Sequence, residues 1–335
     1  MNSILQCISH IEPITQYFLK YDYLKKVNND NSLGSGGRVA KAYSSFLSEV
    51  YSGEYSTLAP RRLKAAMSKF APKFNNDDQQ DSQEFFTSIM DGLHKDVNQG
   101  LSQDVDQVEV NDMTDDMNDD DMAMKLWKNH LLQNKSIFVD CTQGMERSCV
   151  KCTECEGESI KFAVYSSISL PLDTARNSRS IPLTDCLDKF TAKEGLNRYN
   201  AWDCPNCKKK VLAMQQITLW NTPDIMVLHL KRIKECHTTN GTVSHSKNDV
   251  EVDFPIDRLD LTSYISGPEY RDSPPVYELI GVSEHTGPTT ESGHYTARVR
   301  DSKDGNWYYC HDSDVEITSS DKIMTDGAYV LFYQR

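Results

Sequence analysis

The segment Ser-Gly-His-Tyr-Thr-Ala at 292–297 places a histidine where it could act as a general base. A turn-rich stretch precedes His294 and an alternating stretch follows it, which predicts a loop leading into a strand. A second predicted strand over 307–313 follows a short turn, so pairing of the two strands would bring Asp312 near His294. A catalytic histidine needs a partner that fixes its tautomer and stabilises the imidazolium. Asp312 could be that partner; the alternative is a surface histidine beside a surface aspartate.

Four of the ten cysteines form two Cys-x-x-Cys pairs, Cys152 with Cys155 and Cys204 with Cys207. Each pair puts two thiolates on one tight turn, and two such turns together make a tetrahedral zinc site that is closed and therefore structural. Cys149 offers an alternative register for the first pair. In a chain with no secretory features, this pattern favours metal-bound thiolates over disulfides. We expect one structural zinc ion; the alternative is a reduced, metal-free remnant of such a site.

A helix is predicted over 81–94, because apolar residues recur at every fourth position from Phe85. Its first turn is acidic, with Asp81 and Glu84 near the start. These carboxylates could cap the helix and complement its dipole. They could equally stay free to bind a basic ligand, and the sequence leaves both interpretations open.

The remaining pattern predicts a helical first part, to about residue 130, followed by a β-rich part from about residue 135. Helical spacing is clear over 40–51, and a proline opens another helix at 60–67. The continuous apolar run 225–228 is typical of a central strand covered on both faces, and His229 beside it is interpreted as a core histidine. Further strand signals lie at 159–165, 168–172, 277–283 and 329–333. The fold class is therefore α+β.

Composition excludes several classes of function. The chain has 335 residues and a net charge of −13, which disfavours nucleic acid as a partner but suits a basic protein ligand. We find no apolar run of transmembrane length and no signal peptide, so we expect no membrane association and a cytoplasmic or nuclear location. The acidic run 104–121 and the polar segment 237–249 are predicted to be solvated loops.

Four separated motifs resemble those of the ubiquitin-specific proteases, the papain-like family of cysteine deubiquitinases, and occur in the family's order. They span the whole chain. They are Met-Asn-Ser-Ile-Leu-Gln-Cys at 1–7, Gln-Gln-Asp-Ser-Gln-Glu-Phe-Phe at 79–86, the two cysteine pairs, and the His294 segment with Trp-Tyr-Tyr at 307–309 and Ala-Tyr-Val-Leu-Phe-Tyr at 328–333.

The resemblance implies a single catalytic domain over 1–335, with a helical thumb at 1–134, zinc-bearing fingers at 135–211 and a mainly antiparallel palm sheet at 212–335. It implies ubiquitin and ubiquitinated proteins as partners, and hydrolysis at the C-terminal glycine of ubiquitin. Ubiquitin's tail, Leu-Arg-Leu-Arg-Gly-Gly, is basic and could be held by carboxylates. The positions that match the family's tail-binding residues are Asp81, Gln83, Glu84 and Tyr295.

Two positions depart from the family pattern. Counting along the resemblance puts the nucleophilic cysteine two residues before Met1, and Cys7 lies eight residues further on, roughly 12 Å along a helix. We therefore interpret Cys7 as a small apolar helix residue. His311 occupies the position of the family's usual third triad residue, where it offers no negative charge. We expect Asp312 to act as the effective third member or to polarise the oxyanion region.

Two hypotheses remain. One is a cysteine deubiquitinase core in which His294 is the general base. The other is a ubiquitin-binding module that keeps the fold without the chemistry. The chain as given has no nucleophile at the expected place and is expected to be inactive by itself.

Overall fold

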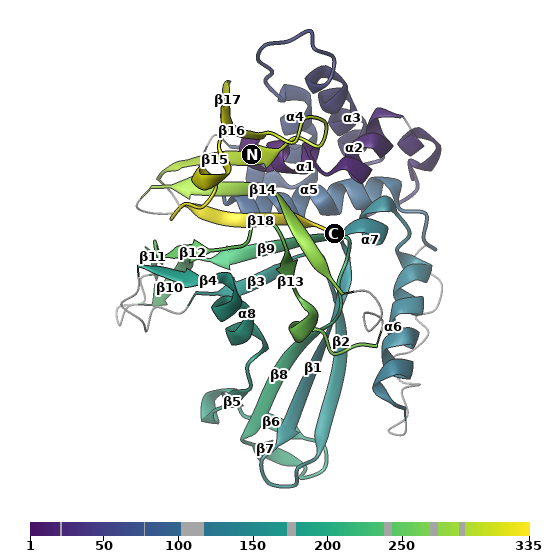
Figure 1. Cartoon of the computed structure of the whole chain (residues 1–335). Coiled ribbons are helices and arrows are strands. Elements are labelled where there is room, and N and C mark those ends of the chain that lie inside the picture. Colours follow the sequence, from purple (N-terminus) through teal and green to yellow (C-terminus); the bar gives the residue numbers. More distant parts are fainter. Residues whose placement is uncertain are drawn as a thin grey trace.

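The computed structural model describes residues 1–20, 22–76, 78–101, 117–172, 179–237, 243–268, 274–287 and 292–335. Figure 1 shows a cluster of helices packed against a large twisted sheet, and a narrow arm of strands that extends away from both. The fold is mixed α+β, as the sequence predicted.

The helical cluster is built from the first part of the chain. Its α-helices are α1 (Asn2–Ser9), α2 (Glu12–Leu19), α3 (Arg38–Val50), α4 (Arg61–Phe70), α5 (Ser82–Val97) and α7 (Ile137–Thr142), with short 3₁₀ turns at Asp22–Lys26 and Pro72–Phe74. The helix α6 (Asp119–Gln133) lies apart from this cluster and packs alongside the arm of strands (Figure 1). The helices predicted near residues 40, 60 and 81 are confirmed as α3, α4 and α5. Pro60 precedes the first residue of α4, where its missing N–H costs no helical hydrogen bond.

The large sheet follows the order β17-β16-β15-β14-β18-β9-β3, with β13 paired to β14. Its strands are β3 (Ile168–Pro171), β9 (Ile225–Lys231), β13 (Leu259–Asp260), β14 (Val276–Thr286), β15 (His294–Arg300), β16 (Trp307–His311), β17 (Asp314–Thr318) and β18 (Ala328–Gln334). Only β3 and β9 pair in parallel among these described strands. The first four residues of β9 are buried, which confirms the prediction of a strand covered on both faces.

Two hydrophobic cores lie on opposite faces of this sheet. On one face α1 and α5 cover the centre of the sheet, where Phe86 of α5 packs edge-to-face on Phe332 at 5.4 Å between ring centroids. On the other face α8 (Leu183–Thr191) and the segment around Leu259 complete a second core. The helical part therefore holds the sheet in place through side chains that are fully removed from water, the largest single contribution to folding.

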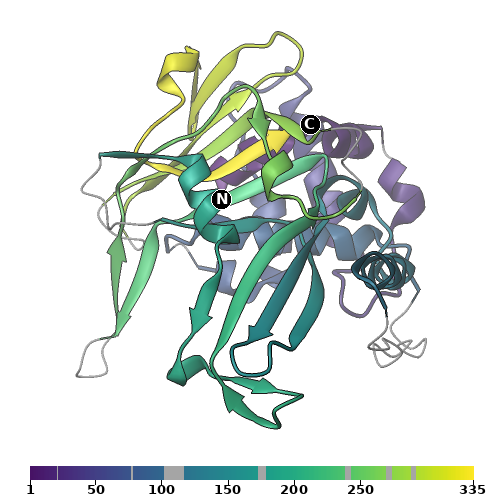
Figure 2. The ribbon, with the colours of Figure 1, turned by 60° about the horizontal axis from the view of Figure 1, so that its bottom comes forward.

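The projecting arm is a four-stranded antiparallel sheet in the order β2-β1-β8-β5, ending in the small hairpin β6–β7 (Figure 2). Its strands are β1 (Gly144–Cys152), β2 (Glu158–Tyr165), β5 (Glu194–Leu196), β6 (Trp202–Cys204), β7 (Lys209–Val211) and β8 (Ala213–Asn221), with a 3₁₀ turn at Arg198–Asn200. The sheets do not follow chain order. The family resemblance implied that the fingers end at residue 211 and that the palm sheet begins at 212. In the structure, β3 lies before this boundary but joins the large sheet, and β8 lies after it but belongs to the arm.

The predicted loop at 237–249 is wrong at 237 and over 243–247, and its residues 238–242 lie outside the described residues. Residues 233–237 and 243–247 form an antiparallel hairpin, β10 (Ile233–His237) with β11 (Val243–Lys247). Strand pairing satisfies the backbone of this hairpin, and its mostly polar sequence gave no hydropathy signal. The remaining strands are β4 (Ser180–Pro182) and β12 (Glu251–Asp253), which pair in parallel, and short 3₁₀ turns lie at Thr262–Tyr264 and Ser320–Lys322.

Two further expectations need correction. The acidic run was predicted as loop to residue 121, but Asp119–Asp121 form the first turn of α6, capped by the Asn118 side chain. The rest of that run, to residue 116, lies outside the described residues. The helical region also continues past residue 135, as far as the end of α7. The sequence did not predict α7 because this helix is buried on most sides and so lacks an amphipathic period. Among the described helices, none combines the length and apolar character that a membrane crossing requires.

Candidate active site

His294 is the first residue of β15, which pairs with β16 as predicted. Asp312 follows β16 directly, in the turn to β17, with a left-handed backbone (φ 52°). The two side chains meet: His294 Nε2 lies 3.5 Å from Asp312 Oδ2. Nε2 is shielded from water and forms no hydrogen bond among the described residues, so the contact is electrostatic in this state. Hydrogen bonds of this kind are often long before substrate binds.

His311 contacts His294 through its ring rather than through charge. The rings of His294 and His311 meet edge-to-face, with centroids 4.6 Å apart and planes at 81°. The His311 ring is also parallel to that of Tyr309. In this geometry His311 packs beside the imidazole, and the only carboxylate that the described residues bring to His294 is that of Asp312.

The first turn of α1 faces this pair. Asn2 Nδ2 donates a 2.9 Å hydrogen bond to Asp312 Oδ1, which ties the start of the helix to the end of β16. A cavity of about 450 Å³ lies here, lined by Met1, Asn2, Gln79, His294 and Asp312 among others. None of the residues described around this cavity carries a thiol.

Cys7 does not serve the site. It is buried in the core beneath α1, with 1% of its surface exposed, and burial raises the pKa of its thiol well above the usual value. A thiol in such surroundings is neither ionised nor reachable by substrate. The interpretation of Cys7 as a small apolar helix residue is confirmed.

The start of α5 lies on the thumb side of the cavity. Asp81 caps this helix: its Oδ1 accepts hydrogen bonds from the backbone N–H groups of Gln83 (2.7 Å) and Glu84 (3.1 Å). Its Oδ2 accepts from the Tyr329 hydroxyl at 2.5 Å. The capping interpretation is therefore confirmed for Asp81, and both of its oxygens are already engaged.

The other expected tail-binding residues surround that cap. Glu84 pairs with Lys73 at 2.9 Å on the surface, and Gln83 Nε2 bonds to the hydroxyl of Thr87 at 3.2 Å. Tyr295 lines the cavity, and its ring packs against His285 at 4.5 Å between centroids. Desolvation raises the pKa of the Tyr295 hydroxyl, so it stays a neutral donor. Of the four expected tail-binding positions, Tyr295 lines the cavity, whereas the other three lie in the first turn of α5, directly after the lining residues Gln79 and Gln80. Their role in ligand binding stays a prediction.

A buried polar network beneath β15 has little signal in the sequence. Glu284 of β14 is almost fully buried and accepts hydrogen bonds from Thr296 (3.1 Å), Arg298 (2.9 Å) and Thr325 (2.7 Å). The Arg298 guanidinium lies 4.4 Å from the centroid of the Tyr309 ring. A buried charge is tolerated only when paired and hydrogen-bonded, so this network fixes β14, β15 and β16 together. Glu284 and Arg298 do not stand out in the sequence, because the same two strands also carry the charged residues Glu278 and Arg300.

The four cysteines expected to bind metal come together at the tip of the arm. The Sγ atoms of Cys152, Cys155, Cys204 and Cys207 all lie within 4.8 Å of one another. Two of the S···S separations are 3.9 and 3.7 Å. A tetrahedral site with Zn–S bonds of about 2.3 Å has S···S edges of about 3.8 Å. The residues therefore fit a zinc ion.

The backbone around each pair has the same form. The residues that follow the pairs, Glu156 and Lys208, both have a left-handed backbone (φ 59° and 54°). Backbone N–H groups point at the sulfurs, as in Cys155 N to Cys152 Sγ at 3.4 Å. Such donors stabilise thiolates, and they lower the pKa of Cys152 to about 7. Cys149 is not in the cluster, so the alternative register is excluded.

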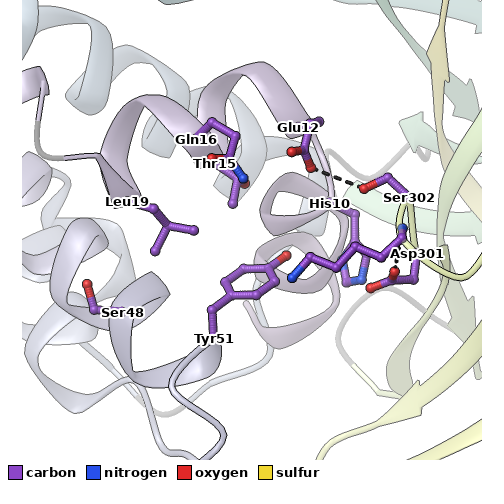
Figure 3. Close-up of a pocket in the computed structure, with 10 residues that line it drawn as sticks. His10, Glu12, Thr15, Gln16, Leu19, Ser48, Tyr51, Asp301 and Ser302 are labelled. Carbon is purple, nitrogen blue, oxygen red and sulfur yellow. Dashed lines mark hydrogen bonds between the residues drawn. The ribbon is translucent and has the colours of Figure 1, made fainter.

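A second cavity, of about 380 Å³, lies at the opposite end of β15 (Figure 3). It is lined by the α1–α2 junction, the end of α3 and the β15–β16 turn. Its polar groups are largely engaged with one another: Ser302 donates to Glu12 at 3.1 Å, and the Lys303 ammonium lies 5.3 Å from the centre of the Tyr51 ring. Neither His294 nor Asp312 lines this cavity, so it is not the candidate active site.

A histidine–carboxylate pair at the end of a sheet, next to the first turn of a helix, is an arrangement that suits a general base and the group that orients it. Comparison with known proteins gives the family. Residues 1–333 match the family model described as "Ubiquitin carboxyl-terminal hydrolase", and the chain belongs to this family.

Relatives agree with this assignment over the whole chain. It is 31% identical over 335 residues to ubiquitin carboxyl-terminal hydrolase 2 of Bos taurus, covering all of this chain and 53% of the relative. It is 30% identical over 352 residues to ubiquitin carboxyl-terminal hydrolase 21 of Homo sapiens, covering all of this chain and 59% of the relative. The chain thus spans little more than half the length of the curated relatives that it matches.

Solved structures show the same fold. The chain superposes with a TM-score of 0.74 and 24% identity on a structure titled "Structure of the SAGA Ubp8/Sgf11/Sus1/Sgf73 DUB module bound to ubiquitin aldehyde", covering all of this chain and 66% of that one. A second structure, titled "Structure of the Ubp8-Sgf11-Sgf73-Sus1 SAGA DUB module", gives a TM-score of 0.69 and 25% identity, covering all of this chain and 64% of that one. The expected deubiquitinase fold is confirmed.

Proposed function

We propose that this chain forms the body of a cysteine deubiquitinase that hydrolyses bonds at the C-terminal glycine of ubiquitin. One observation carries the proposal: in a member of the hydrolase family, His294 and Asp312 meet at the end of the sheet and face the first turn of α1 across a shared cavity. This is where a nucleophile, its base and the scissile bond can be brought together.

In the proposed reaction the nucleophile is a cysteine two residues before Met1 in the full protein, close to the start of α1. A helix N-terminus stabilises a thiolate through its free N–H groups and its dipole. His294 takes the thiol proton, the thiolate attacks the glycine carbonyl, and His294 returns the proton to the leaving amine. Water then releases the acyl-enzyme, with His294 again as base. Asp312 holds the imidazole and stabilises its protonated form.

Ubiquitin is the proposed substrate and binding partner. Two of the similar structures are titled as complexes, one with monoubiquitin and one with ubiquitin aldehyde. In this chain the acidic first turn of α5 borders the cavity and could attract the two arginines of the ubiquitin tail. Glu84 is the better arginine partner, because it pairs with an exposed lysine that a ligand could displace, whereas Asp81 already serves as a cap.

The four-cysteine cluster would hold one structural zinc ion. Four sulfurs at tetrahedral spacing leave no open coordination position for a substrate. The cluster joins the β1–β2 turn to the β6–β7 hairpin, so metal binding would stabilise the tip of the arm.

The second candidate function is a ubiquitin-binding module without catalysis. The observation that favours it is the lack of a thiol among the described residues around the cavity. The two functions differ in turnover but share ubiquitin binding.

A two-part experiment tests the proposal. Isothermal titration of the 335-residue chain with ubiquitin should show specific binding that His294→Ala leaves intact. Adding a segment Asn-x-Gly-x-Thr-Cys-aromatic directly before Met1 should then produce hydrolysis of a ubiquitin C-terminal amide. Binding without turnover in the extended chain would favour the binding module, and no binding in either form would refute both candidates.

A further inference from the structure

A nearly buried lysine lies behind His294, outside the pair proposed to transfer the proton. We propose that Lys247 and His285 are positioning residues that together fix the backbone from which His294 projects. The inference rests on the proposed function, in which His294 is the base. Neither residue touches the reacting atoms; both act through the two ends of the β14–β15 connection.

Lys247 is the last residue of β11, and only 7% of its side chain is exposed. Its ammonium makes three contacts. It donates to the backbone carbonyls of His285 (3.2 Å) and Gly287 (2.9 Å), and it pairs with Asp249 Oδ1 at 2.8 Å. All three N–H donors of the lysine are thus used, which is what a buried ammonium requires. Two of the three partners are main-chain atoms at the end of β14.

The same stretch of β14 is held to the start of β15 on the other side. Thr286 pairs with His294, and His285 pairs with Tyr295. The buried His285 ring lies under Gly293: a Cβ at Gly293 would fall 2.5 Å from His285 Nε2. Position 293 therefore accepts only glycine, and the peptide that enters His294 rests directly on the imidazole of His285.

Gly287 completes this close approach. Its φ of 147° is one that side chains rarely allow, and a Cβ there would fall 2.5 Å from the Cα of Gly293. Gly287, whose carbonyl accepts a hydrogen bond from Lys247, is therefore in van der Waals contact with Gly293, the residue before His294. A shift of Gly287 would be transmitted to Gly293 because no side chain lies between them to absorb it.

His285 also reaches the opposite side of the cleft. Its Nε2 lies 3.5 Å from Nε2 of Gln79, which lines the same cavity as His294. Desolvation and the neighbouring Lys247 lower the pKa of His285, while Asp81 and Asp249 act in the other direction, so the ring is held neutral. A neutral ring can pack beneath a peptide because no charge has to be removed from water. Lys247 and His285 thus connect the β10–β11 hairpin to the backbone that precedes His294, and they connect that backbone to Gln79 of the helical part.

The test compares Lys247→Met, which keeps the length of the side chain and removes its donors, with Lys247→Arg, which keeps charge and donors. Lys161→Met, on the exposed surface of β2, is the matched control. Two quantities are measured in the 335-residue chain, well below its melting temperature: the ring ¹⁵N signals of His294, and the affinity for ubiquitin with and without its last two glycines.

We expect Lys247→Met to shift the His294 ring signals and to weaken binding of intact ubiquitin about tenfold, while binding of the tail-shortened form changes little. Lys247→Arg should recover part of both effects, and Lys161→Met should show neither. Unchanged His294 signals and unchanged tail-dependent affinity in Lys247→Met would overturn the inference. If the wild-type chain binds no ubiquitin but Lys247→Met still shifts the His294 signals, the proposed function fails and the positioning role stands.

Discussion

At the scale of single residues, the site depends on which group assists His294. His311 stands in the usual third position of the family pattern, but it meets His294 only through an edge-to-face ring contact. Asp312 brings a carboxylate to Nε2 at 3.5 Å and is itself held by Asn2. A negative charge stabilises an imidazolium, whereas a second neutral imidazole does not. The geometry thus supports Asp312 as the assisting group.

The role of Asp312 can be tested in the chain that carries the cysteine segment before Met1. Asp312→Ala should lower kcat on the order of a hundredfold or more, because the imidazole loses both its orientation and its counter-charge. His311→Asn should raise kcat several-fold by adding a hydrogen-bonding partner of the usual type. Steady-state kinetics with a ubiquitin amide substrate would decide. A large loss in His311→Ala with no change in Asp312→Ala would reverse the two roles.

A second residue-scale prediction concerns His229, which the structure places in the interior of the large sheet. Its Nδ1 meets the Ser169 hydroxyl at 3.0 Å and its ring packs on Tyr329, as expected of a core histidine. Desolvation lowers its pKa to about 4. The unfolded state therefore binds the extra proton between about pH 6.5 and pH 4, so the stability that this neutral ring contributes is fully present above pH 6.5 and falls as the pH falls through that window.

We expect this single group to account for a loss of about 2–3 kcal/mol between pH 7 and pH 4. The measurement is urea unfolding at both pH values in the wild type and in His229→Gln, which cannot titrate. The variant should be less stable at pH 7 but should lose less on acidification. An identical pH dependence in both proteins would show that His229 is not responsible.

At the scale of elements, the arm depends on its cysteine cluster. The apolar core at its tip is small: Val211 and Trp202 are the main hydrophobic neighbours of the cysteines. Such a tip buries too little apolar surface to be stable alone, and a bound metal would supply the missing free energy.

We therefore predict one zinc ion per chain, lost in Cys204→Ser and kept in Cys149→Ser. Cys149 is the matched control, since it lies on β1 close to the cluster but outside it. Elemental analysis of protein purified reduced and without chelator gives the stoichiometry. Hydrogen exchange should show faster exchange of β6 and β7 in Cys204→Ser, with α1 to α5 unchanged. Full zinc content in Cys204→Ser would contradict the proposed ligand set.

The elements also show where sequence patterns suffice. Amphipathic helices such as α3 and α5 and the apolar strand β9 could be predicted, because each buries one face or both in a regular period. The hairpin β10–β11 and the short helix α7 could not. The hairpin is stabilised by backbone pairing, and α7 is stabilised by burial on most of its sides. Neither kind of stabilisation leaves a regular spacing of apolar residues in the sequence.

At the scale of the whole molecule, the motifs predicted the fold and much of the site. They placed His294 beside Asp312 and gathered the four cysteines correctly. They did not reveal the buried Glu284 network or the contacts of Lys247, because these connect residues that are distant in sequence and of types common on surfaces. Such contacts exist only once the sheet has brought β11, β14 and β15 together.

The candidate site lies where the two largest parts of the molecule join. The helical part and the large sheet meet along α1 and α5, and the site is at one end of that junction. Both sides contribute to it: Met1, Asn2 and Gln79 from the helical part, His294 and Asp312 from the sheet. A site built in this way requires both parts in place.

The central claim is tested most directly by the turnover of a ubiquitin C-terminal amide by three proteins. These are the 335-residue chain, the chain with the cysteine segment before Met1, and that extended chain with serine in place of the added cysteine. We predict hydrolysis only in the second protein, and its loss in His294→Ala. Turnover by the 335-residue chain itself, or turnover in the extended chain that survives His294→Ala, would contradict the claim.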